Sequence, residues 1–106
     1  MKSKGGRPTK YREEFCHRLI EHMETGRSFK TFAGTIGVNR DTLYLWAKTN
    51  PDFRHAKDIA ESACLYHWEK VAIDAVMGKI RINGSLWAWQ MRNRFRWWFH
   101  PAKTPK

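Results

Sequence analysis

The chain has 106 residues, and its 20 Lys and Arg against 10 Asp and Glu give a formal net charge of +10 and a pI of about 10.1. This length suits one small domain, and the basic balance favours a polyanionic partner, either nucleic acid or an anionic membrane surface. With two cysteines, no apolar region after the basic start and no apolar run of roughly 18–20 residues, the sequence argues against a disulfide framework, a signal peptide and a membrane span, so a cytoplasmic location is expected.

Basic residues gather at the two ends of the chain. Residues 1–10 carry four and residues 75–106 carry seven, without any acidic residue, whereas the stretch between them is close to neutral. We therefore expect a helical body with a flexible basic arm over residues 1–10 and a basic tail over residues 100–106.

The first helix is expected after Thr9, a plausible N-cap. Apolar residues recur every four positions from Tyr11 to Met23, which is the period of a helix, and Gly26 then ends it. Ser28 is expected to cap a second helix that ends before Gly37.

Asn39 is expected to cap a third helix over residues 40–48. A fourth helix, over residues 51–77, is expected to start at its proline, which a first turn accepts. A turn then leads to a last helix over residues 86–95, with Ser85 as its cap.

Residues 29–48 have the pattern of a helix-turn-helix unit. Two helices that cross steeply need buried apolar residues, a small residue where they approach, and a glycine in the turn for a positive φ angle. The seven positions that meet these requirements are Phe32, Ala33, Ile36, Gly37, Val38, Leu43 and Trp46. We therefore expect an all-α fold, with a helix-turn-helix DNA-binding domain over residues 11–50 and a helical oligomerisation region over residues 51–99.

The outward face of the third helix is then a candidate for the major groove of DNA. Arg40 is the best candidate for a bidentate contact to guanine, Asn39 and Thr42 can reach bases or phosphates, and Lys48 and Arg27 suit phosphates. The alternative is a solvated polar face on a three-helix bundle. The outward positions are Asn39, Arg40, Asp41, Thr42, Tyr44, Leu45 and Lys48.

The helix over residues 51–77 is apolar on more than one face. One small domain cannot easily bury such a helix, so the surplus apolar surface predicts self-association, with burial inside one chain as the alternative. Ala56, Ala60 and Ala63 would permit close approach of another helix.

The last helix places Trp87, Met91, Phe95 and Trp98 on one stripe. This stripe is open to three interpretations: an oligomer or partner interface, nucleic-acid contact through stacking, and a membrane-surface segment. We favour a combination of core and interface.

No constellation of catalytic residues or metal ligands stands out. Cys16, His17 and His22 on the first helix and Cys64 and His67 on the fourth could in principle bind zinc, but a small buried hydrophobe is the favoured role for each cysteine. The chain has no carboxylate pair, Ser-His-Asp set or phosphate loop. We expect no metal, no cofactor and no enzymatic activity.

Three segments of the chain form an ordered pattern. They are GRPTKY at residues 6–11, GVNRDTLYLWAKTNPDFRHAKDIA at residues 37–60 and NRFRW at residues 93–97. Together they resemble the small terminase subunit of tailed bacteriophages, in which a Gly-Arg-Pro segment, a helix-turn-helix with a late Trp, and a Pro-x-Phe start to a long helix follow one another. The resemblance covers residues 6 to about 98, and Arg96 stands where many relatives carry Gly.

The resemblance implies a protein that recognises the packaging-initiation region of viral DNA in an infected bacterium and assembles as a ring of about eight to eleven subunits. It implies that this ring brings the double-stranded DNA to the large terminase subunit and regulates it, without a catalytic centre of its own. The complete set of expected DNA contacts is Lys4, Arg7, Lys10, Arg27, Asn39, Arg40, Thr42, Tyr44 and Lys48. The expected subunit interface comprises Ala56, Ile59, Ala60, Ala63, Tyr66, Trp68, Trp87, Met91 and Phe95.

Two other functions fit the same residues. A helix-turn-helix transcription regulator or transposase-associated module would use the third helix as a dimer on a palindromic site. A cationic membrane-active or scaffolding protein would use the basic ends without binding DNA.

Overall fold

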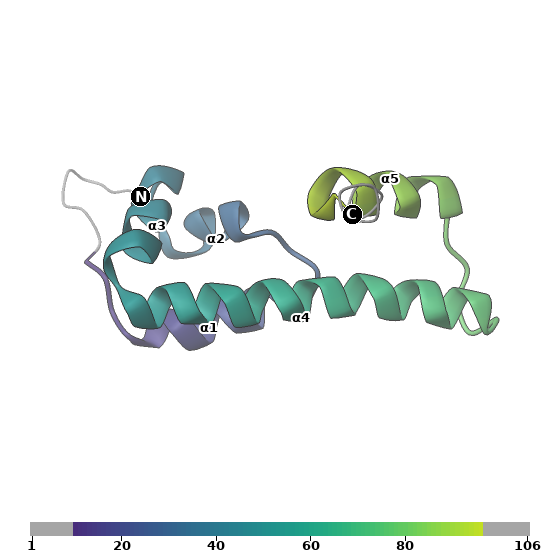
Figure 1. Cartoon of the computed structure of the whole chain (residues 1–106), viewed down its shortest axis with the longest axis horizontal. Helices are drawn as coiled ribbons and strands as arrows, with labels where there is room; N and C mark the ends of the chain where they lie inside the picture. The colour runs from purple at the N-terminus through teal and green to yellow at the C-terminus, as the bar shows by residue number, and fades with distance from the viewer. Residues whose placement is uncertain (1–9, 97–106) are drawn as a thin grey trace, which may run out of the picture. The chain divides into compact units, whose positions relative to one another are not determined.

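Figure 1 shows the computed structural model of the chain, which describes residues 10–96. This part of the chain is built from helices and turns, with no strand, which confirms the all-α class. The five helices are α1 (Glu14–Met23), α2 (Phe29–Ile36), α3 (Arg40–Thr49), α4 (Pro51–Val76) and α5 (Gly84–Phe95). The contacts divide the chain into a first unit, Met1–Cys64, and a second unit, Leu65–Lys106, so that α4 begins in one and ends in the other.

Helix α1 starts later than the sequence pattern predicts. Glu13 holds the N-cap position without a side-chain capping bond, and residues 10–13 precede the helix; the expected cap, Thr9, lies outside the described residues. The side chain of Tyr11 makes tertiary contacts instead, because its hydroxyl donates to Asp52 Oδ2 at 2.8 Å. Its ring lies 5.5 Å from that of Trp46.

The turn between α2 and α3 forms as its residues predict. Ser28 caps α2 by accepting a hydrogen bond from the Thr31 backbone N–H. Gly37 adopts a left-handed conformation with φ of 75°, and the Val38 N–H donates to the Ala33 carbonyl at 3.0 Å, which closes the C-terminal end of α2.

Asn39 caps α3 as expected. Its side-chain oxygen accepts from the backbone N–H groups of Asp41, at 2.7 Å, and Thr42, at 3.3 Å. The other end of α3 is held by Arg54, whose Nη1 donates to the carbonyls of Ala47, at 3.1 Å, and Lys48, at 3.0 Å. Both ends of this ten-residue helix are therefore fixed from within the chain.

Helix α5 differs from the prediction at its start. The N-cap is Asn83, whose side chain accepts from the Leu86 N–H at 3.0 Å, so the assignment of Ser85 as cap is wrong. The helix ends at Phe95, and the C-cap Arg96 has a φ of 53°, the only positive value at a non-glycine among residues 10–96. A left-handed residue at a helix end favours glycine, so arginine here adopts a less favourable backbone conformation.

Aromatic side chains from four helices and from the segment before α1 form the core of the first unit. Phe15 of α1 stacks on Trp46 of α3 at 5.5 Å between ring centroids and 13° between planes. Phe53 of α4 contacts Trp46 at 6.1 Å and Tyr11 at 5.7 Å, both edge to face. Such pairs add about 0.5–1.5 kcal/mol each beyond the buried area. The remaining core residues of this unit are Leu19, Met23, Phe29, Phe32, Ala33, Leu43, Ala47, Ala56, Ala60 and Cys64.

Four of the six apolar positions predicted to hold α2 and α3 together are buried: Phe32, Ala33, Leu43 and Trp46. Ile36 and Val38 are only half-buried. They flank the exposed Gly37, where the chain turns at the surface of the unit, and one side of each therefore remains in solvent.

The second unit has a much smaller core. Among its described residues only Met91 is buried. The Trp87 Nε1–H of α5 donates to the Trp68 carbonyl of α4 at 2.8 Å, and the Arg94 guanidinium lies 5.9 Å from the Trp68 ring centroid. Large apolar side chains remain exposed here, among them Ile73 at 60% and Val76 at 86%.

Gly37→Ala should destabilise the first unit by about 1 kcal/mol, because a Cβ at φ of 75° is strained even though it would meet no atom within 4 Å. The matched control is Gly34→Ala, one turn earlier in α2, where a Cβ also meets nothing and the better helix propensity should stabilise by about 0.5–1 kcal/mol. Urea unfolding at one fixed protein concentration measures both. Shifts of the same sign in the two variants would contradict this account of the turn.

Candidate nucleic-acid interface

Helix α3 has one buried edge and one edge that the described part of the chain leaves open. Leu43, Trp46 and Ala47 are buried against the other helices of the first unit. At about 100° per residue, the opposite edge is formed by residues that are all exposed. These residues are Asp41, Leu45, Lys48 and Thr49, and the exposed Arg40 and Tyr44 lie to one side of them, closer to the buried edge.

The two cations of α3 are exposed and lie at its two ends. Arg40 begins α3 and Lys48 lies in its last turn, and neither forms an ion pair with an acidic residue of the described chain. The spacing of eight residues corresponds to about 12 Å along the helix axis. A guanidinium and an ammonium group so placed can contact base edges and phosphates of one duplex.

Three predicted contacts are partly occupied within the chain. The side-chain oxygen of Asn39 is used to cap α3, and Thr42 is half-buried. Tyr44 is 43% exposed, but its ring packs edge to face on Phe29 of α2 at 5.1 Å. Their main contribution here is to fix α3.

The remaining predicted DNA contacts lie before and between the helices. Arg27 is exposed and donates to Thr25 Oγ1 at 2.8 Å. Lys10 is exposed and directly precedes Tyr11, which contacts α3 through Trp46. Lys4 and Arg7 lie outside the described residues.

Three residues predicted at the subunit interface offer no surface to another subunit. Ala56 and Ala60 are buried in the first unit, at 3% and 0% exposure, and Met91 is buried in the second at 0%. Ile59 and Tyr66 are exposed, and four other predicted interface residues are half-buried: Ala63, Trp68, Trp87 and Phe95. The helix pattern identified an apolar face but could not tell whether its own chain covers it.

Other apolar residues of the second unit are exposed but were absent from the predicted interface. On α4, Ile73 follows Tyr66, a predicted interface residue, by seven positions, so the two side chains fall on one line of the helix surface. The exposed large apolar residues that the sequence analysis left out of the interface are Ile73, Val76, Met77, Ile80, Ile82, Leu86 and Trp89.

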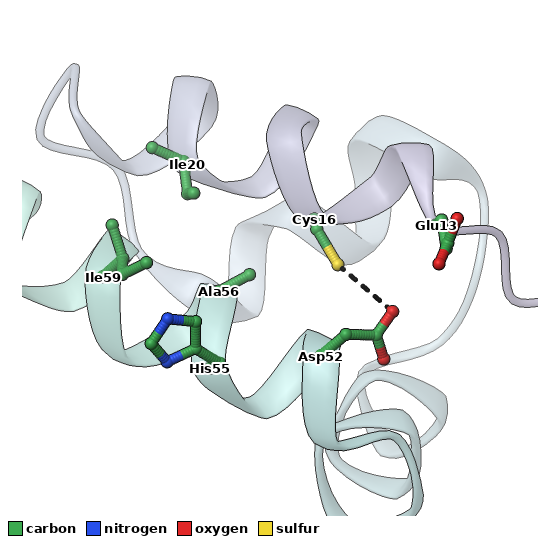
Figure 2. A pocket seen from close by; sticks show the side chains of 7 residues that line it. All are labelled: Glu13, Cys16, Ile20, Asp52, His55, Ala56 and Ile59. Carbon is green, nitrogen blue, oxygen red and sulfur yellow. Dashed lines mark hydrogen bonds between the residues drawn. The ribbon is translucent and has the colours of Figure 1, made fainter.

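A shallow hollow of about 390 Å³ lies between α1 and the start of α4, as Figure 2 shows. Its lining is Glu13, Cys16, Ile20, Asp52, His55, Ala56 and Ile59. These positions recur at helical spacing on each helix, but the spacing does not show that the two helices meet here, and the hollow was not predicted.

The polar groups of the hollow connect the two helices. Cys16 Sγ lies 3.9 Å from Asp52 Oδ2, and the Tyr11 hydroxyl joins both residues. Burial and the hydrogen bonds with Cys16 and Asp52 raise the pKa of the Tyr11 hydroxyl well above its usual range. The hydroxyl therefore stays protonated and holds the segment before α1 to the start of α4.

The cysteines and histidines that the sequence offered for zinc have separate contacts. Cys64 is buried near the Arg27 carbonyl, at 3.5 Å, and His22 contacts the start of α2. Within residues 10–96, no three His, Cys, Asp or Glu side chains come together as a metal-binding group.

None of the helices in residues 10–96 combines the length and hydropathy that a membrane crossing requires. No family model, curated protein or solved structure matches the chain. The resemblance to small terminase subunits therefore stays a prediction from the sequence segments.

His22 links α1 to the cap of α2. Its Nε2 lies 3.0 Å from the Ser28 carbonyl and 3.0 Å from Thr31 Oγ1, and the carbonyl requires that Nε2 carry the proton. Burial lowers the pKa of His22, a shift that the Ser28 hydrogen bond opposes and the positive charge of Arg27 reinforces.

Since folding lowers the pKa of His22 from its ordinary value of 6.5, the unfolded chain binds the proton more readily. His22 therefore contributes stability above pH 6.5 that is lost as the pH falls through its folded-state pKa. Urea midpoints should decrease between pH 7.5 and 5 in the parent protein, and His22→Gln should reduce that decrease. His55→Gln, at an exposed imidazole of α4, is the matched control and should keep the parent profile. An unchanged pH profile in His22→Gln would contradict the assignment.

Proposed function

We propose that the chain is a DNA-recognition subunit that binds duplex DNA through α3 and assembles into a ring, in the manner of the small terminase subunit of tailed bacteriophages. In this role it recognises viral DNA for packaging and recruits and regulates a large terminase subunit. The observation that carries the proposal is the exposed surface of α3, which includes Arg40 and Lys48, while Leu43, Trp46 and Ala47 are buried against the other helices of the first unit.

In the proposed complex, α2, the turn at Gly37 and α3 act as a helix-turn-helix. The N-terminal residues of a recognition helix meet base edges, which suits the guanidinium of Arg40 to a guanine. Lys48 in the last turn and Arg27 before α2 suit phosphates. Because the aromatic core and the end caps already fix α3, little ordering of the helix itself would oppose binding.

The proposed assembly rests on the second unit. A helical pair with one buried side chain among its described residues gains little from its own core, whereas its exposed apolar residues would gain from cover by another subunit. A ring forms when each subunit presents such a surface to the next and the rotation closes.

Native mass spectrometry and negative-stain imaging of the full chain test the assembly, and titration with duplex DNA at several salt concentrations tests recognition. A closed ring larger than a tetramer that binds duplex in a salt-dependent manner is the expected result. A dimer that protects two half-sites about one helical turn apart would instead identify a transcription regulator or transposase-associated module. A monomer without affinity for duplex at low salt would contradict both.

Arg40→Ala and Lys48→Ala should weaken binding in different ways. Arg40→Ala removes a bidentate guanine contact and should reduce discrimination between a selected site and random duplex by roughly 5- to 100-fold. Lys48→Ala removes a phosphate contact, so it should weaken binding to all duplexes alike and reduce the slope of log affinity against log salt concentration by about one. Titrations of both variants on both duplexes at two salt concentrations measure the difference. If Arg40→Ala weakens binding to every sequence equally, Arg40 does not read a base.

Ile73→Asp should break the assembly. The side chain is 60% exposed in the single chain, so the charge should leave the helix folded, but at a subunit contact it would be buried without a partner. Light scattering after size exclusion should show smaller species at micromolar concentration. The matched control is Ser85→Asp, which adds the same charge at an exposed polar position of α5. Assembly that persists in Ile73→Asp would place the contact elsewhere.

A further inference from the structure

Leu45 is the most exposed apolar side chain of α3, at 55%. Along the helix surface it follows Asp41 by one turn and precedes Lys48 by one turn, so it lies in the middle of the outer edge. A single exposed leucine is common on protein surfaces and carries no meaning by itself. Its significance here comes from its position between charged residues on the edge that the proposed function directs to DNA.

The neighbours of Leu45 leave its side chain clear. The ring of Tyr44 is drawn toward α2 by its edge contact with Phe29 at 5.1 Å. Thr49, one turn later, donates its hydroxyl back to the Leu45 carbonyl at 2.9 Å, which satisfies this polar group inside the helix. The isobutyl group of Leu45 is therefore the apolar feature that α3 offers outward.

Near Leu45, the charges of α3 favour contact with base edges over contact with phosphates. Asp41 carries a negative charge that phosphates would repel, and Arg40 and Lys48 at the two ends supply the attraction to the duplex backbone. The middle of the edge is thus suited to the floor of the major groove rather than to its walls.

In the major groove, the apolar group that bases present is the 5-methyl group of thymine. A leucine has neither donor nor acceptor, so against any other base edge it would cover polar atoms without satisfying them. Against a thymine methyl group it would bury apolar surface on both sides.

We propose that Leu45 is a specificity-determining residue that contacts the 5-methyl group of a thymine in the major groove. This inference rests on the proposed function and adds to it the kind of base that the middle of α3 selects.

The test removes the methyl group from the DNA and the isobutyl group from the protein. Full-length protein selects binding sites from a random duplex library, and each thymine of the selected site is then replaced singly by deoxyuridine, which differs by that methyl group alone. At one thymine position, the replacement should weaken binding of the parent protein by about three- to fivefold, the value of one buried methyl group. Leu45→Ala should bind the two duplexes equally.

Two further variants are controls for a general loss of folding or of DNA contact. Leu45→Met, which conserves volume and apolar character, should retain most of the preference for thymine. Ser62→Ala, at an exposed position of α4 away from this edge, should retain all of it. Circular dichroism melting of each variant checks that α3 remains folded.

The outcomes separate this inference from the proposed function. Site-selective binding that no deoxyuridine replacement weakens, or a thymine preference that persists in Leu45→Ala, would overturn the role of Leu45 and leave DNA recognition in place. Duplex binding without any selected sequence would also overturn it. Absence of salt-dependent duplex binding would overturn the proposed function and this inference with it.

Discussion

The stacking of Trp46 on Phe15 is the contact on which the orientation of α3 depends. The Trp46 ring is surrounded by side chains from α1, from α4 and from Tyr11, at centroid distances of 5.5–6.1 Å. A helix whose one edge is held in this way can present only its opposite edge, because side-chain directions around a helix are fixed. The exposure of Lys48 therefore follows from an apolar contact on the far side of the helix. Arg40, at the first position of α3, is exposed at the side of the helix.

The polar groups at the ends of α3 complete this arrangement. The side chain of Asn39 satisfies two backbone N–H groups at its start, and Arg54 satisfies two carbonyls at its end. A helix of ten residues would be marginal alone, since most of its stability must come from packing and capping. With these demands met by residues outside the outer edge, the side chains of that edge are available for a partner.

The sequence predicted local features better than long-range ones. The caps Ser28 and Asn39 and the positive φ of Gly37 depend on a few neighbouring residues, and each was found from the sequence. The cap of α5 was misplaced by two residues because Asn83 and Ser85 are both good caps and only the backbone geometry decides between them. The hydrogen bonds of Arg54 depend on atoms that only the folded chain positions. The hollow between α1 and α4 depends on which helices pack together, and helical spacing within each helix does not predict that pairing. The alanines of α4 were assigned to another subunit because an apolar face looks the same whether its own chain or another covers it.

The two units differ in how their stability is supplied, and this difference bears on the proposed function. The first unit has four helices around a shared aromatic core, whereas the second leaves Ile73 and Val76 largely in solvent. If neighbouring subunits cover these residues, ordering of the second unit is coupled to assembly. Each added subunit would then bring another copy of α3 to the same duplex. Affinity would arise from the effective concentration of many weak contacts rather than from one strong contact, so a recognition helix with only two outward cations could suffice.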